Sequence, residues 1–525
     1  MKKILLALFL TVPLLAQSNL PKLLQRHPVS GQSVNLDGSS EYASKSSPVN
    51  LDLNGSEYIS NSRNTGFETT GTDWAGNGNH SLARSTTDKK TGTYSLAVTS
   101  SAAGDATTNY ASLASTNFSS IVSGKKYTLE GYARGTGVLG SELTSNGDFA
   151  SDTWWGKDVG VTITSGVGRF SSVASGKGLY KISLCTSTKT YAITYTILNY
   201  SSGSVRWEFA SASGSTRNSN GTYTDYIVAD NATPYLVSKT AGTTLDVDNV
   251  SIKEVTLPTL TLAIGNQTKA ISSVSCVSGT FTKLVWNFQA TANEVNQPIK
   301  IYANQADIVY LDDVSLTQAY DALVSAWVKV PTSFSTIGSV VSNGSIVPDA
   351  GFRLMIRGDQ NGYAYGYISD NITQKLATVN IDCRSNTAYK LVHVVFNRTG
   401  NLTMYSNGVA YNTADISGIG KVVSTSSLFV GRDYYSANYF SGNLGEVQIT
   451  RFDDIATSNV SANTLLSAYK GGLGTWSNGN IVAWYKWRGS TDAQLLYDYS
   501  GNGNSLSGVN VTQSGDQERG SYPSK

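Results

Sequence analysis

Apolar and polar residues alternate with a period of two along most of this 525-residue chain. Residues 126–132 (KYTLEGY) and 391–396 (LVHVVF) are examples, and Asn-Gly, Ser-Gly and Gly-Asn turns separate such stretches. This alternation is typical of β-strands with one buried face, joined by tight turns. Helical periodicity is nearly absent, except at residues 461–469, where Ser461 can cap a short helix and Gly471 can end it. The sequence therefore predicts an all-β fold.

The composition supports strands and argues against two kinds of site. Gly contributes 50 residues and Tyr 30, whereas charged residues make up only 14%, as in strands joined by polar turns. The formal net charge is +2 and the basic residues are scattered, so we expect no nucleic-acid partner. Cys185, Cys276 and Cys383 are too far apart for a disulfide framework or a paired-cysteine metal motif. We expect them to be small buried apolar side chains.

The N-terminal segment 1–16 (MKKILLALFLTVPLLA) has the pattern of a secretory signal, with two lysines before an apolar stretch. This stretch is shorter than the roughly 20 residues that a membrane-spanning helix needs, and no later segment is apolar enough to span a bilayer. We therefore predict a secreted or surface-displayed protein with no membrane span once the signal is removed.

Two stretches of the chain resemble each other as beginnings of a unit, and two further stretches resemble each other as ends of a unit. The openings are residues 56–61 (SEYISN), which lead to Gly-Phe-Glu at 66–68, and residues 141–149 (SELTSNGDF). The closings are residues 245–252 (LDVDNVSI) and 310–316 (YLDDVSL). The order along the chain is open, open, close, close, which indicates one unit nested inside another and not a tandem repeat.

The same argument applies to the outermost segments, because residues 33–53 stop before any partner strand has appeared. Their continuation begins at residues 323–330 (LVSAWVKV), and the inner insertion falls at a hairpin tip, where insertions are tolerated. The prediction is three antiparallel jelly-roll β-sandwiches nested by insertion: an outer one of residues 33–55 plus 321–512, a first inserted one of 56–136 plus 258–320, and a second inserted one of 137–257.

The motifs VNLDGSSEY, LVSAWVKV, VVFNRTGNLTMYSNGVAY, VAWYKW and DYSGNGNSLSG of the outer segments resemble a laminin-G, concanavalin A-like jelly roll. TGTYSLAV with IKIYANQADIVYLDDVSL in the first inserted unit, and SNGDFASDTWW with VDNVSIKEV in the second, resemble the four/nine-type family of carbohydrate-binding modules. The second unit departs further from that family. The combination of SNGDFA with a later VDNVSIKEV is also similar to modules of bacteriophage virion proteins. These resemblances imply sandwich folds that bind carbohydrate.

Sugar recognition uses aromatic faces for stacking and polar groups for the hydroxyls. The candidates are Trp74, Trp154, Trp155, Trp207 and Trp286 in the inserted units and Tyr434, Tyr435, Tyr439, Trp476, Tyr363 and Tyr365 in the outer sandwich. For each, packing in the core or at the rim is the alternative. Trp154 and Trp155 point to opposite faces if they lie in a strand, and we expect Trp155 to be exposed. Trp286, Trp327 and Trp484 alternate with apolar residues and are expected in the cores.

The resemblance to carbohydrate-binding modules implies a structural calcium ion where the opening Gly-Phe-Glu meets the closing Asp-Asp. The matching residues are Glu68 and Asp313 in the first inserted unit, and Asp148 with Asp248 in the second. Carboxylate oxygens suit calcium, and no cysteine or histidine cluster is needed. Asn249 removes one charge from the second site and makes it the weaker one. The alternative is that these carboxylates cap turns at strand ends.

These features predict a non-catalytic extracellular protein for adhesion, with glycans or cell-surface polysaccharide as partners. Two alternatives stay open: a virion-surface component, such as a decoration or fibre protein that contacts its own copies or other virion proteins, and a glycoside hydrolase with two close carboxylates. The chain has 3 histidines and no Gly-x-Ser-x-Gly or His-Glu-x-x-His motif, so we expect no enzyme. His393 alternates with valines and is expected to be structural.

Overall fold

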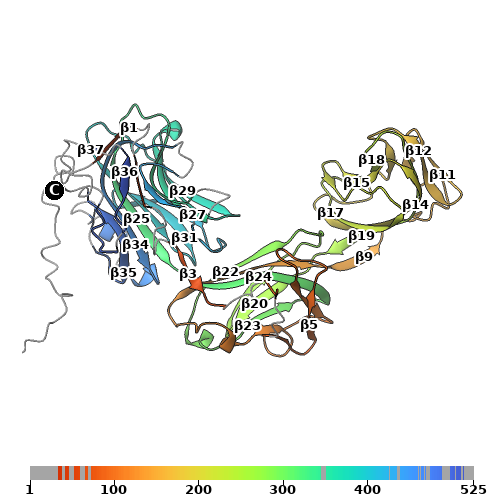
Figure 1. Ribbon diagram of the computed structural model, residues 1–525, viewed down its shortest axis with the longest axis horizontal. Coiled ribbons are helices and arrows are strands. Elements are labelled where there is room, and N and C mark those ends of the chain that lie inside the picture. The colour runs from red at the N-terminus through yellow and green to blue at the C-terminus, as the bar shows by residue number, and fades with distance from the viewer. Residues whose placement is uncertain are drawn as a thin grey trace, which may run out of the picture. The chain divides into compact units, whose positions relative to one another are not determined.

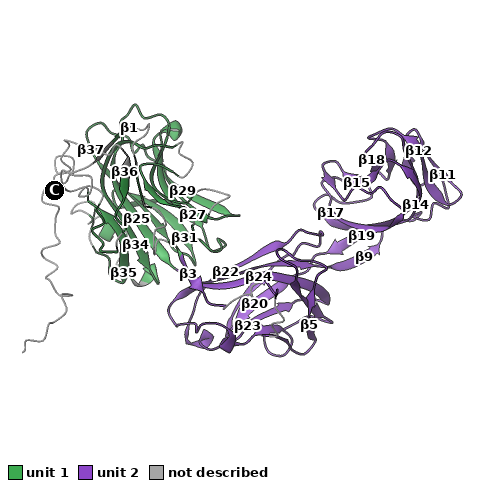
Figure 2. Ribbon diagram, viewed as in Figure 1, with its two compact units in different colours: residues 1–53, 320–525 green, residues 54–319 purple. Residues whose placement is uncertain are grey.

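The computed structural model describes residues 34–37, 42–45, 52–59, 66–68, 73–344, 350–424, 426–433, 438–458, 460–461, 463–465, 468, 473, 475–486, 497–502, 504–509 and 512–513. Antiparallel strands dominate these residues, which confirms the prediction of an all-β fold. The chain divides into two compact units (Figure 2). Unit 1 consists of Met1–Leu53 and Tyr320–Lys525, and unit 2 consists of Asn54–Ala319.

Unit 1 is a sandwich of two antiparallel sheets (Figure 1). Sheet A has the order β32 (Val409–Asp415), β31 (Asn401–Ser406), β30 (Lys390–Phe396), β25 (Asp321–Lys329), β34 (Ser441–Phe452), β1 (Val34–Asp37), β37 (Thr512–Gln513), and β35 (Gly479–Tyr485) also pairs with β34. Sheet B has the order β29 (Gln374–Val379), β28 (Tyr363–Asp370), β27 (Ala350–Arg357), β26 (Ile337–Asn343), β33 (Leu428–Val430), β2 (Tyr42–Lys45), β36 (Ser507–Val509).

The two strands that precede unit 2 in the chain lie inside the sheets of unit 1. Val34 of β1 pairs with Leu444 of β34, and Ala43 of β2 pairs with Val430 of β33. The chain leaves unit 1 and returns to it at one point, because the Tyr320 N–H donates to the Leu53 carbonyl over 2.8 Å. Unit 1 is therefore closed by hydrogen bonds between segments that are remote in sequence.

The core of unit 1 follows from the alternation of side chains along its strands. Val392 and Val394 of β30 face the main core between the sheets, whereas Leu391 and Val395 face a second apolar cluster on the other side of sheet A. Apolar residues after β34 cover that side, among them Leu465 and Trp476. The central strands β25 and β30 are thus buried on both faces and read as nearly continuous apolar runs, whereas the edge strand β32 is largely exposed.

Unit 2 contains two sandwiches. In the first, sheet C has the order β22 (Thr282–Gln289), β8 (Lys126–Gly135), β24 (Asp307–Ala319), β6 (Ser95–Ser100), β5 (His80–Ser85), with β3 (Asn54–Glu57) paired to β24, and sheet D has the order β21 (Gln267–Ile271), β20 (Leu260–Ile264), β23 (Ile299–Ala303), β7 (Ala111–Leu113), β4 (Trp74–Gly76). One apolar cluster, which includes Leu129, Leu262 and Leu311, lies between these sheets.

The second sandwich of unit 2 is built from the strands that lie between β8 and β20 in the chain. Its sheet E has the order β11 (Val161–Thr164), β12 (Val167–Val173), β19 (Thr243–Thr256), β14 (Thr190–Ser202), β17 (Gly221–Val228), with β9 (Val138–Glu142) paired to β19, and its sheet F has the order β10 (Gly156–Lys157), β13 (Gly178–Tyr180), β18 (Tyr235–Ser238), β15 (Val205–Phe209), β16 (Ala212–Ser213). Phe170, Trp207 and Val247 lie in its core.

The two sandwiches of unit 2 repeat one side-chain arrangement. Glu57 Oε1 accepts hydrogen bonds from the Ile59 N–H (3.1 Å) and the Leu316 N–H (2.8 Å). Glu142 Oε1 does the same with Thr144 and Ile252, at 2.9 Å each. The two glutamates align in the openings SEYISN and SELTSN, and each ties its opening strand to the closing strand of the same sandwich. Glu57 is half-buried and Glu142 is exposed, and each carboxylate is held in place by several hydrogen-bond donors.

Several smaller predictions are confirmed. Cys185, Cys276 and Cys383 are buried free thiols, and Asn463–Leu465 is helical with the Ser461 hydroxyl accepting from the Thr464 N–H over 3.3 Å. The other helical turns are the 3₁₀ segments η3 (Ser115–Asn117), η4 (Ala292–Glu294), η5 (Gly358–Gln360) and η6 (Ile455–Thr457).

Over the described ranges, no helix has the length and apolar character that crossing a bilayer requires.

His393 is structural, as predicted. Its side chain is fully buried in β30, and its Nδ1 lies 2.7 Å from the Ser325 hydroxyl of β25. Burial disfavours the charged imidazolium and lowers the pKa of His393 to about 3. In an unfolded chain a histidine has a pKa of about 6.5, so the unfolded state binds the proton first as the pH falls.

Unit 1 should therefore lose stability between pH 6.5 and about 3 in a way that depends on His393. Between pH 6 and pH 4 the loss due to this one group amounts to about 2.5 kcal/mol. His393→Gln keeps a partner for Ser325 and removes the titration, so the variant should lose about that much less over the same interval. Urea unfolding of the full chain at several pH values measures the difference, and parallel stability profiles for the two proteins would contradict it.

Candidate functional site

Three tyrosines lie on the outer face of sheet B. The core-facing residues of β28 include Ala364 and Ile368. Because side chains alternate along a strand, Tyr363, Tyr365 and Tyr367 point away from the core. The rings of Tyr365 and Tyr367 are stacked, with centroids 6.2 Å apart and an interplanar angle of 19°. Tyr363 and Tyr365 are half-buried, so parts of their rings face solvent, whereas Tyr367 is only 8% exposed and supports the Tyr365 ring from behind.

An arginine of the neighbouring strand completes this surface. Arg357 is the cross-strand partner of Tyr363, and its guanidinium lies 5.5 Å from the centre of the Tyr365 ring. Its Nε donates to Asp359 Oδ1 over 3.1 Å. This hydrogen-bonded ion pair raises the pKa of Arg357 and lowers that of Asp359, so both groups are charged at neutral pH. We call the surface formed by Tyr363, Tyr365, Tyr367 and Arg357 the tyrosine face.

A buried ion pair fixes one end of the tyrosine face. Arg353, the cross-strand partner of Tyr367, pairs with Asp433 over 3.0 Å, and the two side chains are 4% and 1% exposed. The Arg353 Nε also donates to the Ser339 hydroxyl over 2.8 Å, and Asn438 donates to Asp433. The chain segment that carries Asp433 and Asn438 is thereby held against β26 and β27 at this end of the face.

This segment also carries three of the tyrosines that the sequence singled out. The Ser339 N–H donates to the Asn438 carbonyl over 3.0 Å, which places the half-buried Tyr439 next to β26. Tyr434 and Tyr435 lie outside the described residues. Their roles in sugar binding stay predictions.

The structure corrects one prediction about the tryptophans. Trp155 is only 3% exposed and packs against Trp207, whereas Trp154 is half-buried and has Lys181 Nζ 4.6 Å from its ring centre. The prediction that Trp155 is the exposed one was wrong because residues 152–155 form a bend, where strand alternation does not apply. Trp154 is therefore the more exposed tryptophan of this pair.

Trp74 and Trp476 are also buried, each 6% exposed. Trp74 packs 6.3 Å from Phe67, and Trp476 Nε1 donates to Gln448 over 2.9 Å inside the second apolar cluster of unit 1. These positions favour the packing alternative that the sequence left open. Trp286, Trp327 and Trp484 lie in cores, as predicted.

The predicted metal residues of the first sandwich lie close together. An ideal Cβ added to Gly66 would lie 3.7 Å from Glu68 Cγ and 3.8 Å from Asp313 Oδ1. Both carboxylates cap the segment 91–94: Glu68 Oε1 accepts from the N–H groups of Thr93 and Tyr94, at 2.8 and 3.0 Å. Asp313 Oδ1 accepts from the Thr91 hydroxyl at 2.8 Å. The capping alternative is therefore realised, and each carboxylate keeps one oxygen outside these bonds.

The electrostatics of this cluster suit a cation. Burial is the main cause that raises the pKa of Asp313, and the Glu68 carboxylate raises it further. The pKa of the adjacent Asp312 is raised to about 6, mainly by burial and in part by Asp313. Phe67 and Asp313 both have a positive φ, 54° and 48°, and such backbone strain gathers where a fixed geometry is needed. The residues of the first sandwich fit a hard cation in charge and ligand type.

The second sandwich offers less to a cation. Asp148 is exposed and accepts from the Ala150 N–H at 3.3 Å, while Asp248 accepts from its own neighbour Asn249 at 2.7 Å. Across the described part of the chain, no three His, Cys, Asp or Glu side chains form a group able to hold a metal ion. Calcium therefore stays a prediction, with Glu68 and Asp313 as its stronger site.

Sequence reasoning named Tyr363 and Tyr365 but missed Tyr367, Arg357 and Asp359. The signal was present in the stretch YAYGY at 363–367, where tyrosines alternate with small residues. Such a pattern puts all three rings on one face of a strand. The arginine could not be assigned to this face, because its partner strand is set only by the sheet register.

A family model described as the concanavalin A-like lectin/glucanases superfamily matches residues 303–452. The match spans less than a third of the chain and includes β25 to β34, the strands that carry the tyrosine face. A comparison with curated protein sequences gives no match.

Several solved structures are similar over part of the chain. The receptor binding domain of botulinum neurotoxin C/D mosaic serotype is 16% identical, with 28% of this chain and 35% of that chain covered and a TM-score of 0.22. The heptameric SAP-like pentraxin from Limulus polyphemus is 14% identical, with 28% and 69% covered and a TM-score of 0.22. The chain thus spans about a third of the neurotoxin chain it matches. At these TM-scores the likeness carries no argument about the function.

If calcium binds at Glu68 and Asp313, it should stabilise the folded first sandwich and raise its unfolding midpoint. A ligand present at 100 times its Kd adds about 2.7 kcal/mol to the stability. Asp313→Asn removes one of the two charges and should abolish most of the calcium-dependent shift, whereas Asp152→Asn, which changes an exposed carboxylate elsewhere, should leave it unchanged. Differential scanning calorimetry with calcium and with a chelator measures the shift, and a midpoint that does not respond to calcium would refute the site.

Proposed function

We propose that this protein is a non-catalytic glycan-binding protein and that the tyrosine face of unit 1 is its main binding surface. The observation that carries the proposal is the pair of half-buried rings of Tyr363 and Tyr365 on one strand, stacked on the buried Tyr367 and beside the Arg357–Asp359 pair. Tyrosine rings offer flat apolar faces for the C–H groups of a sugar ring. A charged pair beside them offers both donors and acceptors for its hydroxyls.

The family match supports this assignment, because it covers the strands of the tyrosine face and its description names carbohydrate-binding and carbohydrate-cleaving proteins. The buried Arg353–Asp433 pair supports it too, since it holds one end of the face in place before any ligand binds. A preformed site loses less conformational entropy on binding.

The carboxylates of this surface favour binding over hydrolysis. A glycosidase needs a carboxylic acid whose pKa is raised, so that it can protonate the leaving group. The pKa of Asp359 is lowered by Arg357, and Asp433 is buried in its pair with Arg353. The proposal therefore includes no catalytic step.

We extend the proposal to an extracellular location, where cell-surface glycans and polysaccharides are the available ligands. The support is the sequence of segment 1–16, which lies outside the described residues. Attachment to a virion surface is the alternative that the module resemblance leaves open. The two differ in assembly state, which sedimentation of the purified chain measures.

The proposal predicts that Tyr365→Ala weakens glycan binding by at least about tenfold, or about 1.4 kcal/mol, because a stacked ring near the centre of a site contributes strongly. Tyr365→Phe should keep most of the affinity, since it keeps the ring. The full chain is first screened on a glycan array, and the affinities of the variants for the bound glycans are then measured by titration calorimetry.

Tyr223→Ala serves as the matched control, because Tyr223 lies in unit 2 and also has an arginine 4.7 Å from its ring centre. It should bind as the unchanged protein does. Equal affinity of Tyr365→Ala and the unchanged chain would refute the tyrosine face, and a chain that binds no glycan would refute the proposed function.

A further inference from the structure

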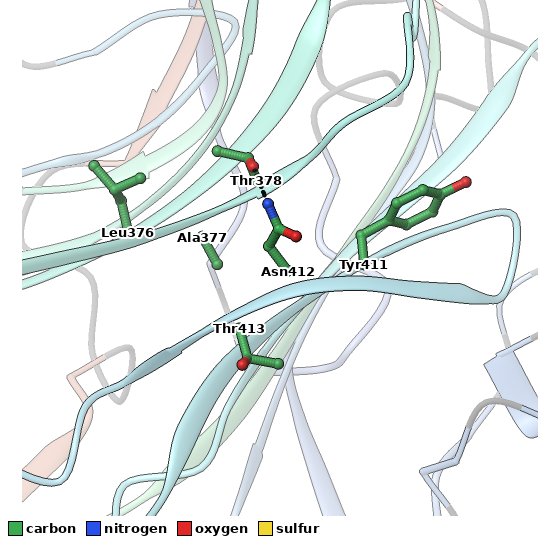
Figure 3. A pocket seen from close by; sticks show the side chains of 6 residues that line it. All are labelled: Leu376, Ala377, Thr378, Tyr411, Asn412 and Thr413. Carbon is green, nitrogen blue, oxygen red and sulfur yellow. Dashed lines mark hydrogen bonds between the residues drawn. The ribbon is translucent and has the colours of Figure 1, made fainter.

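A groove of about 450 Å³ lies between the two free sheet edges of unit 1 (Figure 3). β29 is the last strand of sheet B and β32 is the last strand of sheet A, and the groove is lined by Leu376, Ala377, Thr378, Tyr411, Asn412 and Thr413 from these two strands. Its volume is within the range of roughly 300–1,000 Å³ that is common for small-molecule sites.

A fixed amide group crosses this groove. Asn412 Nδ2 donates to the Thr378 hydroxyl over 2.8 Å and to Asn380 Oδ1 over 3.1 Å. The Thr378 hydroxyl in turn donates to Asn380 Oδ1 over 2.6 Å. Both N–H groups of the Asn412 amide are thus used to orient it. Its carbonyl oxygen takes no part in these bonds and lies on the side of Tyr411 in Figure 3, where it can accept a hydrogen bond from a ligand.

The chemistry of the walls points to a neutral ligand that carries many hydroxyl groups. Among the residues that the structure describes, no Asp, Glu, Lys, Arg or His side chain lines the groove. Leu376 is 42% exposed and Tyr411 packs against the edge of the main core, so apolar surface lies beside the fixed amide and the hydroxyls of Thr378 and Thr413. Uncharged sugar units match this mixture, whereas an acidic sugar would find no cation among the lining side chains.

The groove continues the tyrosine face. Tyr365 and Thr378 are cross-strand partners in sheet B, and so are Tyr367 and Leu376. Neighbouring strands lie about 4.8 Å apart, so the tyrosines and the groove are separated by one strand spacing. A single extended ligand can therefore contact both surfaces.

We propose that the groove between β29 and β32 is a second subsite for neutral sugar units, so that the protein binds the interior of a neutral polysaccharide chain across the tyrosine face and the groove. This inference rests on the proposed function and adds to it the ligand class and a second set of contacts. An extended peptide pairing with a free strand edge is the competing occupant. The bridge from Thr378 to Asn412 disfavours it, because these side chains occupy the space between the two edges.

The test compares Asn412→Ala and Thr378→Val with Asn401→Ala in the full chain. Asn401 is an exposed asparagine of β31, in the same sheet, and does not line the groove, so it controls for the loss of a surface amide. The probes are cello-, laminari- and xylo-oligosaccharides of two to six units, with oligogalacturonate as the acidic probe. Unfolding midpoints of all variants establish that each protein is folded.

The affinity of the unchanged chain for the neutral series should rise with chain length. In the variants Asn412→Ala and Thr378→Val the affinity should no longer rise with chain length. Each variant should bind the longest oligosaccharide about tenfold more weakly than the unchanged chain does, and the shortest one equally well. Asn401→Ala should behave as the unchanged protein. Tyr365→Ala should weaken the binding of all lengths.

Three outcomes would overturn the inference while the proposed function stands: equal affinity of Asn412→Ala and the unchanged chain for every length, binding of oligogalacturonate alone, or an extended peptide from a random library whose binding, unlike that of the sugars, is lost in Asn412→Ala. Failure of the chain to bind any sugar, with or without these substitutions, refutes the proposed function itself.

Discussion

The pairing of β1 with β34 is the interaction on which unit 1 depends. Val34 to Asp37 lie beside Ser441 to Leu444 in sheet A, and β2 takes the corresponding place in sheet B. Without β1, β34 would lose a partner over Ser441–Leu444, and without β2, β33 would lose a partner over Leu428–Val430. The entropic cost of closing a loop rises only slowly with its length, and here the inserted chain is itself folded, with ends joined by the bond from Tyr320 to Leu53. A large insertion is therefore compatible with a closed sandwich.

The binding surface proposed here is the part of sheet B whose outer face stays open. That part comprises Arg357 of β27, Tyr363 and Tyr365 of β28 and the edge strand β29, whereas Arg353 and Tyr367 are buried on the same face. Its tyrosines are set by alternation along β28, and the groove arises where the free edges of the two sheets approach each other at β29 and β32. The side chains that carry the proposed function thus lie on regular strands, and a rigid scaffold is what a preformed site needs.

Sequence reasoning worked best where one local rule applied. Alternation placed Trp327 and His393 inside unit 1, and the scarcity and spacing of cysteines predicted buried thiols. It failed at Trp155, where a bend replaced the expected strand. It also identified the carboxylates Glu68 and Asp313 as partners, and the structure adds what they do: they cap the segment from Thr91 to Tyr94.

The sequence by itself determined the all-β class, the apolar residues that fill the cores and the two related openings at Glu57 and Glu142. These depend on period-two patterns and on turn residues, which act over a few neighbouring positions. Only the tertiary structure decided that Arg357 lies beside Tyr363, that Asn412 reaches Thr378, and that Trp154 is half-buried while Trp155 is buried. The register between strands, and which segments pack on each face of a sheet, depend on contacts between parts of the chain that are remote in sequence. No local pattern specifies them.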